Sequence, residues 1–200
     1  MIVNETINVT MNTTLQESQG NAVISFFSLI QDRIIELITA PSRYPEMLWM
    51  AIPLIFTLFV MQLYFGRYIK EELGWNTAVG NSMVLIFISI DLFRYIYNHF
   101  EPHHWIVYFY QYKKSLIALL ILVQGMILWK ENFFHKWPKK IAFFISSPIC
   151  VNLIAYVALA SVYSNVPFDG ITLIAALVIF FILAGIFHLI HKVEYVPEQT

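Results

Sequence analysis

The segment SMVLIFISIDLFRYIYN, residues 82–98, decides what kind of protein this chain forms. It begins with nine residues that are almost all apolar, as in a helix that crosses a lipid bilayer, and then places two full charges, Asp91 and Arg94, three residues apart. A carboxylate and a guanidinium at positions i and i+3 lie on the same face of a helix, where they can neutralise each other. The segment therefore predicts a membrane-spanning helix with a polar stripe on its second half.

The composition of the whole chain also indicates a membrane protein. Of its 200 residues, 58% are hydrophobic and 12% are charged, and the mean hydropathy is +0.65. A soluble domain carries about 25% charged residues, so this chain lacks the charge that an aqueous surface requires. We expect an all-α integral membrane protein with about five transmembrane helices, at residues 46–66, 82–98, 115–130, 141–163 and 171–191.

The distribution of basic residues predicts the orientation of these spans, because lysine and arginine concentrate in cytoplasmic loops. With the N-terminus outside, the internal segments carry seven basic residues and the external loops carry two: Arg67, Lys70, Lys130, Lys136, Lys139, Lys140 and Lys192 against Lys113 and Lys114. The run 115–130 is short for a span, but if it stayed outside, residues 99–140 would form an external loop with six lysines. We expect a multi-pass protein of the cell membrane with an external or lumenal N-terminus and a cytoplasmic C-terminus.

The polar N-terminal tail, residues 1–22, contains three matches to the N-glycosylation acceptor N-x-[ST], at Asn4, Asn8 and Asn12. Three matches in so short a segment favour true acceptor sites over chance matches in a disordered tail. This interpretation agrees with an external tail, because glycans are added on that side of the membrane.

An amphipathic helix is predicted between the tail and the first span, over residues 23–39, with Pro41 ending it. The helix would lie in the membrane interface, or it would pack on its own bundle or on a partner. Its apolar face carries Val23, Phe27, Ile30, Ile34, Leu37 and Ile38.

The polar stripe of residues 82–98 suggests an intramembrane polar layer. The spans 82–98 and 141–163 are expected to cross the membrane in the same direction. Counted from their starts, Asn152 and Tyr156 of the span 141–163 lie near the depth of Asp91. Pro148 adds a kink to the helix that carries them. The layer would be an ion or proton path, a substrate pocket or a buried clasp between helices. We favour the clasp, because polar groups often hold membrane helices together and no second acid is available to relay a proton. Its predicted members are Asp91, Arg94, Tyr95, Asn98, Asn152 and Tyr156.

A cluster of histidines follows the second span, and its members His99, Glu101, His103 and His104 are residue types that ligate divalent metals. The spacing matches no helical metal motif, and Pro102 would interrupt a helix that aligned the ligands. We therefore favour a polar and aromatic interfacial loop over a metal site, and we expect no cofactor. The single cysteine of the chain cannot form an intrachain disulfide or a CxxC pair.

Three regions emerge along the chain: an external tail with the amphipathic helix (1–45), a transmembrane bundle (46–192) and a short cytoplasmic tail (193–200). A net charge of −1 without a basic block argues against nucleic acid as a partner. We expect an accessory, scaffold or interaction subunit of a membrane assembly, in contact with the bilayer and with another membrane protein or a second copy. The alternatives are a transporter or channel subunit for ions, protons or small solutes that uses Asp91 and Arg94, and a membrane metalloenzyme.

Overall fold

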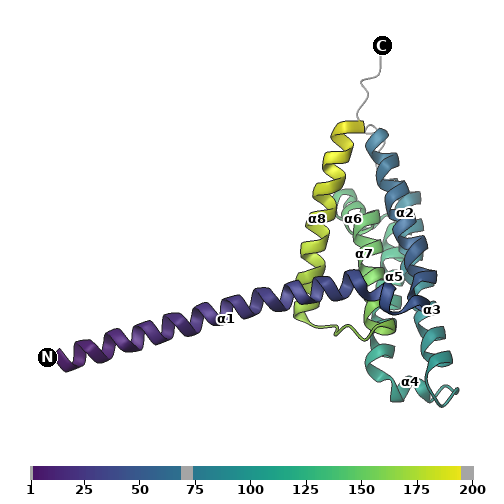
Figure 1. Ribbon diagram of the computed structural model, residues 1–200. Helices are drawn as coiled ribbons and strands as arrows, with labels where there is room; N and C mark the ends of the chain where they lie inside the picture. Colours follow the sequence, from purple (N-terminus) through teal and green to yellow (C-terminus); the bar gives the residue numbers. More distant parts are fainter. Residues whose placement is uncertain (1, 69–73, 195–200) are drawn as a thin grey trace, which may run out of the picture.

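The computed structural model describes the backbone of residues 2–68 and 74–194, and the side chains of residues 21–68 and 74–192. This part of the chain is 86% α-helical and contains no strand. Its elements are α1 (Ile2–Arg43), the 3₁₀ turn η1 (Pro45–Met47), α2 (Leu48–Arg67), α3 (Trp75–His99), α4 (Val107–Tyr110), α5 (Tyr112–Phe133), α6 (Lys139–Ile145), α7 (Pro148–Tyr163) and α8 (Gly170–Glu194). Figure 1 shows the long helices gathered in a bundle that α1 crosses near the start of α8.

The predicted all-α class is confirmed. Four helical segments of the described chain are long and apolar enough to cross a membrane, and the bent pair α6–α7 makes a fifth if it counts as one span. The four are Pro45–Arg67, Trp75–His99, Tyr112–Phe133 and Gly170–Lys192. The run 115–130, which is short in the sequence, lies within a helix of 22 residues, so its length is compatible with a span.

The fourth predicted span is broken rather than only kinked. Helices α6 and α7 meet at an angle of 40° across Ser146 and Ser147. A residue that precedes proline avoids the α-helical region, and Ser147 accordingly has φ −64° and ψ 151°. Its Oγ then accepts a hydrogen bond from the N–H of Cys150 at 3.4 Å, so that Ser147 caps the new helix.

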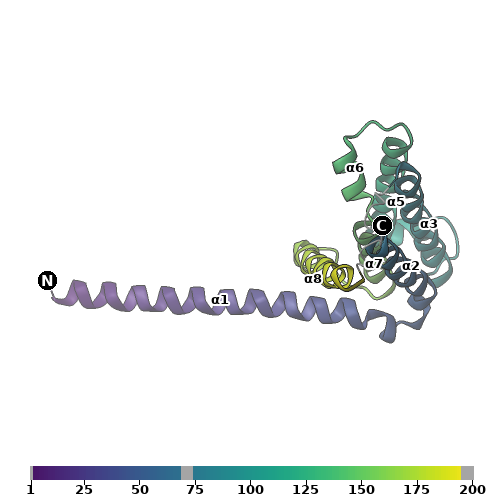
Figure 2. The same ribbon diagram turned by 90° about the horizontal axis from the view of Figure 1, so that it is seen from above.

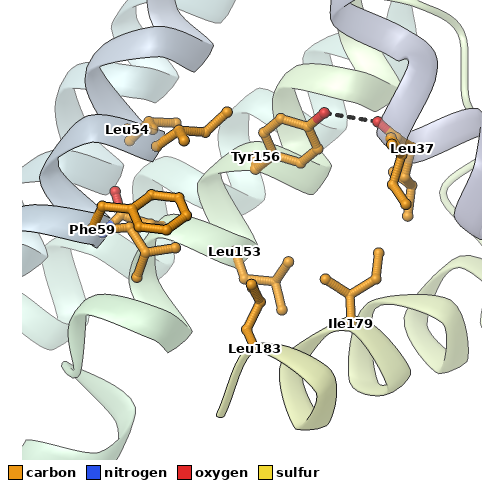
Figure 3. Close-up of a pocket in the computed structure, with 11 residues that line it drawn as sticks. Leu37, Leu54, Phe59, Leu153, Tyr156, Ile179 and Leu183 are labelled. Atoms are coloured by element: carbon orange, nitrogen blue, oxygen red, sulfur yellow. Dashed lines mark hydrogen bonds between the residues drawn. The ribbon is translucent and has the colours of Figure 1, made fainter. Parts of the chain in front are cut away.

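The prediction that Pro41 ends the N-terminal helix is wrong. Helix α1 continues through Pro41 to Arg43, and it begins at Ile2, so the predicted tail and amphipathic helix form one continuous helix. Proline has no N–H to donate to the carbonyl four residues earlier, which here belongs to Leu37. The hydroxyl of Tyr156 on α7 donates to that carbonyl at 2.7 Å (Figure 3). A contact distant in sequence therefore compensates for the proline.

The apolar face of α1 is covered over only part of its length. Ile30 and Leu37 are buried, and α1 contacts α7 and α8. The segment of α1 before this contact projects beyond the bundle (Figures 1 and 2). The helix is thus attached to the bundle through the C-terminal part of its apolar face.

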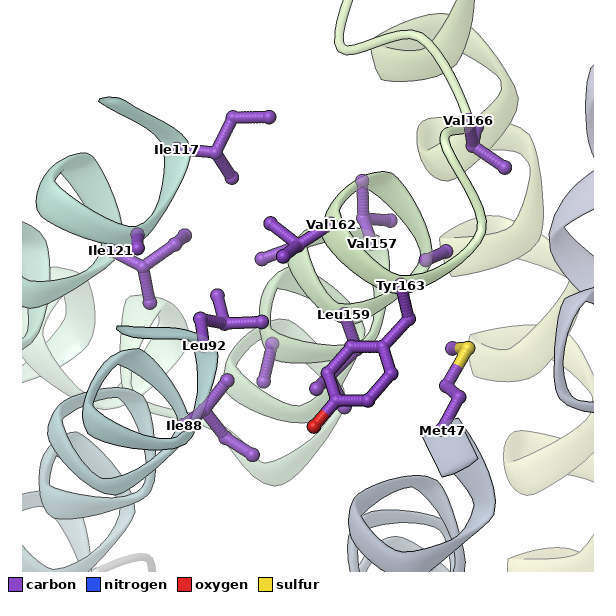
Figure 4. Packing of buried hydrophobic residues seen from close by; sticks show 14 of the residues in the cluster. Met47, Ile88, Leu92, Ile117, Ile121, Val157, Leu159, Val162, Tyr163 and Val166 are labelled. Atoms are coloured by element: carbon purple, nitrogen blue, oxygen red, sulfur yellow. The ribbon is translucent and has the colours of Figure 1, made fainter. Parts of the chain in front are cut away.

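The centre of the bundle is an apolar core around α3, which packs against α5 and α7. Leu85, Ile88 and Leu92 of α3 are buried, and Ile121 of α5 and Leu159 of α7 belong to the same cluster (Figure 4). The contact between α3 and α5 is made close by Gly125 of α5. A Cβ atom at this glycine would lie 3.0 Å from Cβ of Leu85, so no larger residue fits without displacement.

Candidate functional site

Asp91 and Arg94 form the ion pair that their spacing predicts. Oδ1 of Asp91 accepts hydrogen bonds from Nε of Arg94 at 3.0 Å and from Nη2 at 2.5 Å. The second carboxylate oxygen, Oδ2, accepts a hydrogen bond of 2.7 Å from the hydroxyl of Tyr163 on α7. The side chain of Asp91 is 8% exposed and that of Arg94 is 63% exposed. A buried carboxylate is thus bound from two helices, with its counter-charge at the surface of the bundle.

Asn152 and Tyr156 do not join Asp91, contrary to the predicted layer. The amide of Asn152 donates to the carbonyl of Pro148 within α7 at 2.8 Å, and Tyr156 bonds to α1. The position of a residue along the sequence gives the depth of its Cα atom, whereas a long side chain on a helix points back toward the N-terminus of that helix. The phenol of Tyr163 therefore lies closer to the N-terminus of α7 than its own Cα atom does. This residue was missed, although a tyrosine at the end of an apolar helix is a recognisable signal.

An aromatic stack extends from the buried carboxylate to the surface. The ring of Tyr95 lies between those of Tyr163, at a centroid distance of 3.8 Å, and His99, at 4.8 Å. His99 in turn has Nδ1 3.7 Å from Oε2 of Glu46. Asn98, the fourth predicted residue of the stripe, is exposed, and it lines a cleft beside this stack. The end of α3 is thereby linked to the corner between α1 and α2.

Two clefts flank this stack, and both are lined by Glu46, Tyr95, His99 and Tyr163. One has a volume of about 360 Å³ and is completed by Trp49, Arg94 and Asn98. The other has a volume of about 300 Å³, and it is also lined by the cations Arg43 and Lys114. We call the second one the basic cleft.

The predicted metal ligands are not brought together. Nδ1 of His103 lies 3.2 Å from the carbonyl oxygen of Tyr97, the ring of His104 lies against Trp105, and His99 faces Glu46. Glu101 is exposed. Among the residues that the structure describes, no three or more His, Cys, Asp or Glu side chains form a group able to hold a metal ion.

The predicted glycosylation sites Asn4, Asn8 and Asn12 lie in α1, but their side chains fall outside the described residues. The short cytoplasmic tail predicted at 193–200 also lies beyond the described side chains. Both therefore stay predictions.

A second polar cluster, which sequence reasoning missed, lies near the start of α3. The buried amide of Asn132 on α5 donates to Oγ of Ser82 at 2.9 Å and to Oγ of Ser146 at 2.7 Å. Asn81 on α3 donates to the carbonyl of Ser146 at 2.7 Å. This cluster joins α3 and α5 to the break between α6 and α7. It was missed because Asn132 stands beside charged residues in the sequence, which indicates a surface position.

Helix α1 is also attached by polar contacts to the loop before α8. Nη1 of Arg33 donates to the carbonyl of Pro167 at 3.3 Å, and Nη2 lies 3.5 Å from Oδ2 of Asp169. Oδ1 of Asp169 accepts the backbone N–H of Thr172 at 2.8 Å, which caps α8. This hydrogen bond, assisted by the charge of Arg33, holds the pKa of the Asp169 carboxyl below its usual value. The direction of α1 is thus set by an ion pair as well as by apolar packing.

The arrangement as a whole contains a satisfied buried carboxylate, a polar cluster and a basic cleft at the surface, but no assembled set of metal ligands among the described residues. No protein-family model, curated protein or solved structure matches this chain.

Proposed function

We propose that this chain is a polytopic membrane protein with about five spans whose main role is interaction, as an accessory or scaffold subunit of a membrane assembly. Its N-terminus is external or lumenal, where Asn4, Asn8 and Asn12 would accept glycans, and its C-terminus is cytoplasmic. The observation that carries this proposal is the half-covered apolar stripe of α1.

The stripe runs along one helical face and is packed on the bundle at Ile30, Ile34 and Leu37. Toward the N-terminus the same face continues with Val23, Phe26 and Phe27, which are 54%, 43% and 64% exposed. Large side chains exposed in a contiguous row mark a surface that binds protein or membrane. Because Arg33 and Leu37 hold α1 to the bundle, the uncovered part is presented in a defined direction.

The orientation rests on the two ends of the bundle. Helix α1 lies near the start of α8, whereas α6 and the end of α8 lie toward the other end (Figure 1). Lys130 lies in the last turn of α5, Lys136 in the loop that follows, and Lys139 at the start of α6. The positive-inside rule therefore supports a cytoplasmic location for that end and an external location for α1.

The geometry around Asp91 favours a clasp over a transport path. Both oxygens of the carboxylate have partners, which is the arrangement of a structural ion pair. Along α3, the positions between this site and the Asn132 cluster include Leu85 and Ile88, which are buried in the apolar core. Water and ions would have to displace packed side chains there.

Site-directed photo-crosslinking in native membranes tests the proposal. A photoreactive phenylalanine analogue at Phe27 should give a discrete adduct with a membrane protein or a second copy of the chain. The same analogue at Asp32, which is exposed on the opposite face of α1, is the matched control and should give much less. Purified protein in liposomes should show no ion flux. Flux that is lost on Asp91→Asn, together with adducts to lipid alone at Phe27, would contradict the interaction role and support transport.

A further inference from the structure

The basic cleft has an excess of positive charge. Its walls come from the corner between α1 and α2, the end of α3, the start of α5 and the end of α7. Two cations, Arg43 and Lys114, and one carboxylate, Glu46, line it. Glu46 faces His99. Asp91 does not line the cleft, and its oxygens are bound by Arg94 and Tyr163.

Lys114 is a half-buried ammonium without an acidic partner. Its Nζ donates to the carbonyl of Val162 at 2.6 Å and lies 4.7 Å from the centroid of the Phe100 ring. Within the described part of the chain, no carboxylate lies within ion-pair distance of this nitrogen. A partly desolvated cation favours an opposite charge beside it, and the cleft is where such a charge fits. An ammonium has three donors, so at least one remains for a ligand.

Arg43 adds a second positive charge to the same cleft. It lies in the last turn of α1, where its guanidinium is exposed, and it has no ion-pair partner among the described side chains. It stands at the cleft at the end of a helix that continues through Pro41. The fold thus brings together a lysine and an arginine that are 71 positions apart in the sequence.

We propose that the basic cleft binds a phosphate-class anion between Arg43 and Lys114. A lipid head group is the source that the surroundings favour. The basic cleft shares Glu46, Tyr95, His99 and Tyr163 with the neighbouring cleft, which Trp49 lines. Trp49 is 83% exposed, and exposed tryptophans of this kind lie at the level of lipid head groups. A volume of about 300 Å³ suits a head group whose acyl chains remain outside along the apolar helices. This inference does not depend on the proposed interaction role.

Thermal unfolding of the full chain in nanodiscs tests the site. The probes are discs of phosphatidylcholine alone, the same discs with phosphatidylglycerol, and phosphatidylcholine discs with inorganic phosphate, each at equal ionic strength. Phosphatidylglycerol should raise Tm by about 5 °C. Arg43→Gln and Lys114→Gln should each lose most of this increase, and Lys114→Arg should retain it. Because the readout is the difference between discs for one variant, a general loss of stability in Lys114→Gln does not affect it.

Lys113→Gln is the matched control, since it removes the same charge one residue away and Lys113 does not line the basic cleft. It should keep the full increase in Tm. If inorganic phosphate gives the increase and Lys114→Gln removes it, the site stands and its ligand is a free anion. The proposal is overturned if neither probe raises Tm, or if Lys113→Gln loses as much of the increase as the two cleft variants. Native mass spectrometry of the same variants should show retained phosphatidylglycerol in the native chain and in Lys113→Gln only.

Discussion

Tyr163 at the end of α7 donates a hydrogen bond of 2.7 Å to Asp91 in the middle of α3, across 72 positions of sequence. The contact joins two long apolar helices. Within α3, Asp91 is bound by Arg94, and Tyr163 adds a partner from α7. It converts a pair formed within one helix into a connection between helices. Variants of these three residues should therefore report on how the bundle is held together.

Replacement of Arg94 should cost more than replacement of Asp91, because the carboxylate is buried and the guanidinium is exposed. Arg94→Met leaves a buried charge with one neutral donor and should lower the free energy of unfolding by about 2 kcal/mol or more. Asp91→Asn leaves an arginine that water can reach and should cost less. The double variant should be milder than the sum of the two. Tm of the four proteins in detergent checks this, and additive losses would show that the pair is not coupled.

Tyr156→Phe should destabilise the attachment of α1 by about 1–2 kcal/mol, because the Leu37 carbonyl then loses the hydroxyl donor that replaces the missing N–H of Pro41. Pro41→Ala restores a backbone N–H at that position. In the Pro41→Ala background, Tyr156→Phe should therefore cost clearly less. Equal costs in both backgrounds, measured by circular dichroism during heating, would mean that the hydroxyl does not compensate for the proline.

Gly125→Ala should destabilise the bundle by about 1–3 kcal/mol, because the new Cβ would lie 3.0 Å from Leu85 Cβ and 3.1 Å from the backbone nitrogen of Ile86. Gly80 on α3 provides the control, since a Cβ there meets nothing within 4 Å. Gly80→Ala should be neutral or stabilise by up to about 1 kcal/mol through helix propensity. Chemical unfolding of both variants measures the difference, and a neutral Gly125→Ala would argue against close packing of α3 and α5.

The contact between Arg33 and Asp169 should weaken in acid. The pKa of Asp169 is lowered below 3.8 in the folded protein, first by the hydrogen bond from the Thr172 N–H and further by Arg33. A lowered pKa contributes stability that is present above the ordinary value and is lost as pH falls through the folded value. Tm of the native chain should therefore drop below about pH 4, and Asp169→Asn should remove this part of the drop. Asp32→Asn, which removes an exposed acid one residue before Arg33, should leave the profile unchanged.

Cysteine labelling should establish the orientation. With Cys150 replaced by Ser, a cysteine at Lys136 should be protected from an impermeant maleimide added outside intact cells, and a cysteine at Asn165 should react. Both should react after permeabilisation. External labelling at position 136 would exclude the five-span arrangement with an external N-terminus.

The amino-acid sequence by itself determined the all-α class of this protein and the places of most of its long helices. Apolar length and helical periodicity are local properties, so the long helices around residues 46–66 and 171–191 could be predicted within a few residues of their observed ends. The helix predicted at 82–98 was also found, but it begins at Trp75, because its first two turns are more polar than a membrane span. The ion pair of Asp91 and Arg94 could also be predicted, because both partners lie on one turn of one helix.

Only the tertiary structure decided which helices contact each other and at which positions along their axes. Tyr163 rather than Asn152 binds Asp91, and Asn132 joins the break at Ser146, because side-chain direction and helix breaks shift the levels at which polar groups meet. The continuation of α1 through Pro41 also depends on another helix, because Tyr156 of α7 donates the hydrogen bond to the Leu37 carbonyl that Pro41 cannot donate. A periodic pattern records which face of a helix is apolar, but the partner of each polar atom depends on rotations and offsets between helices that no single segment encodes.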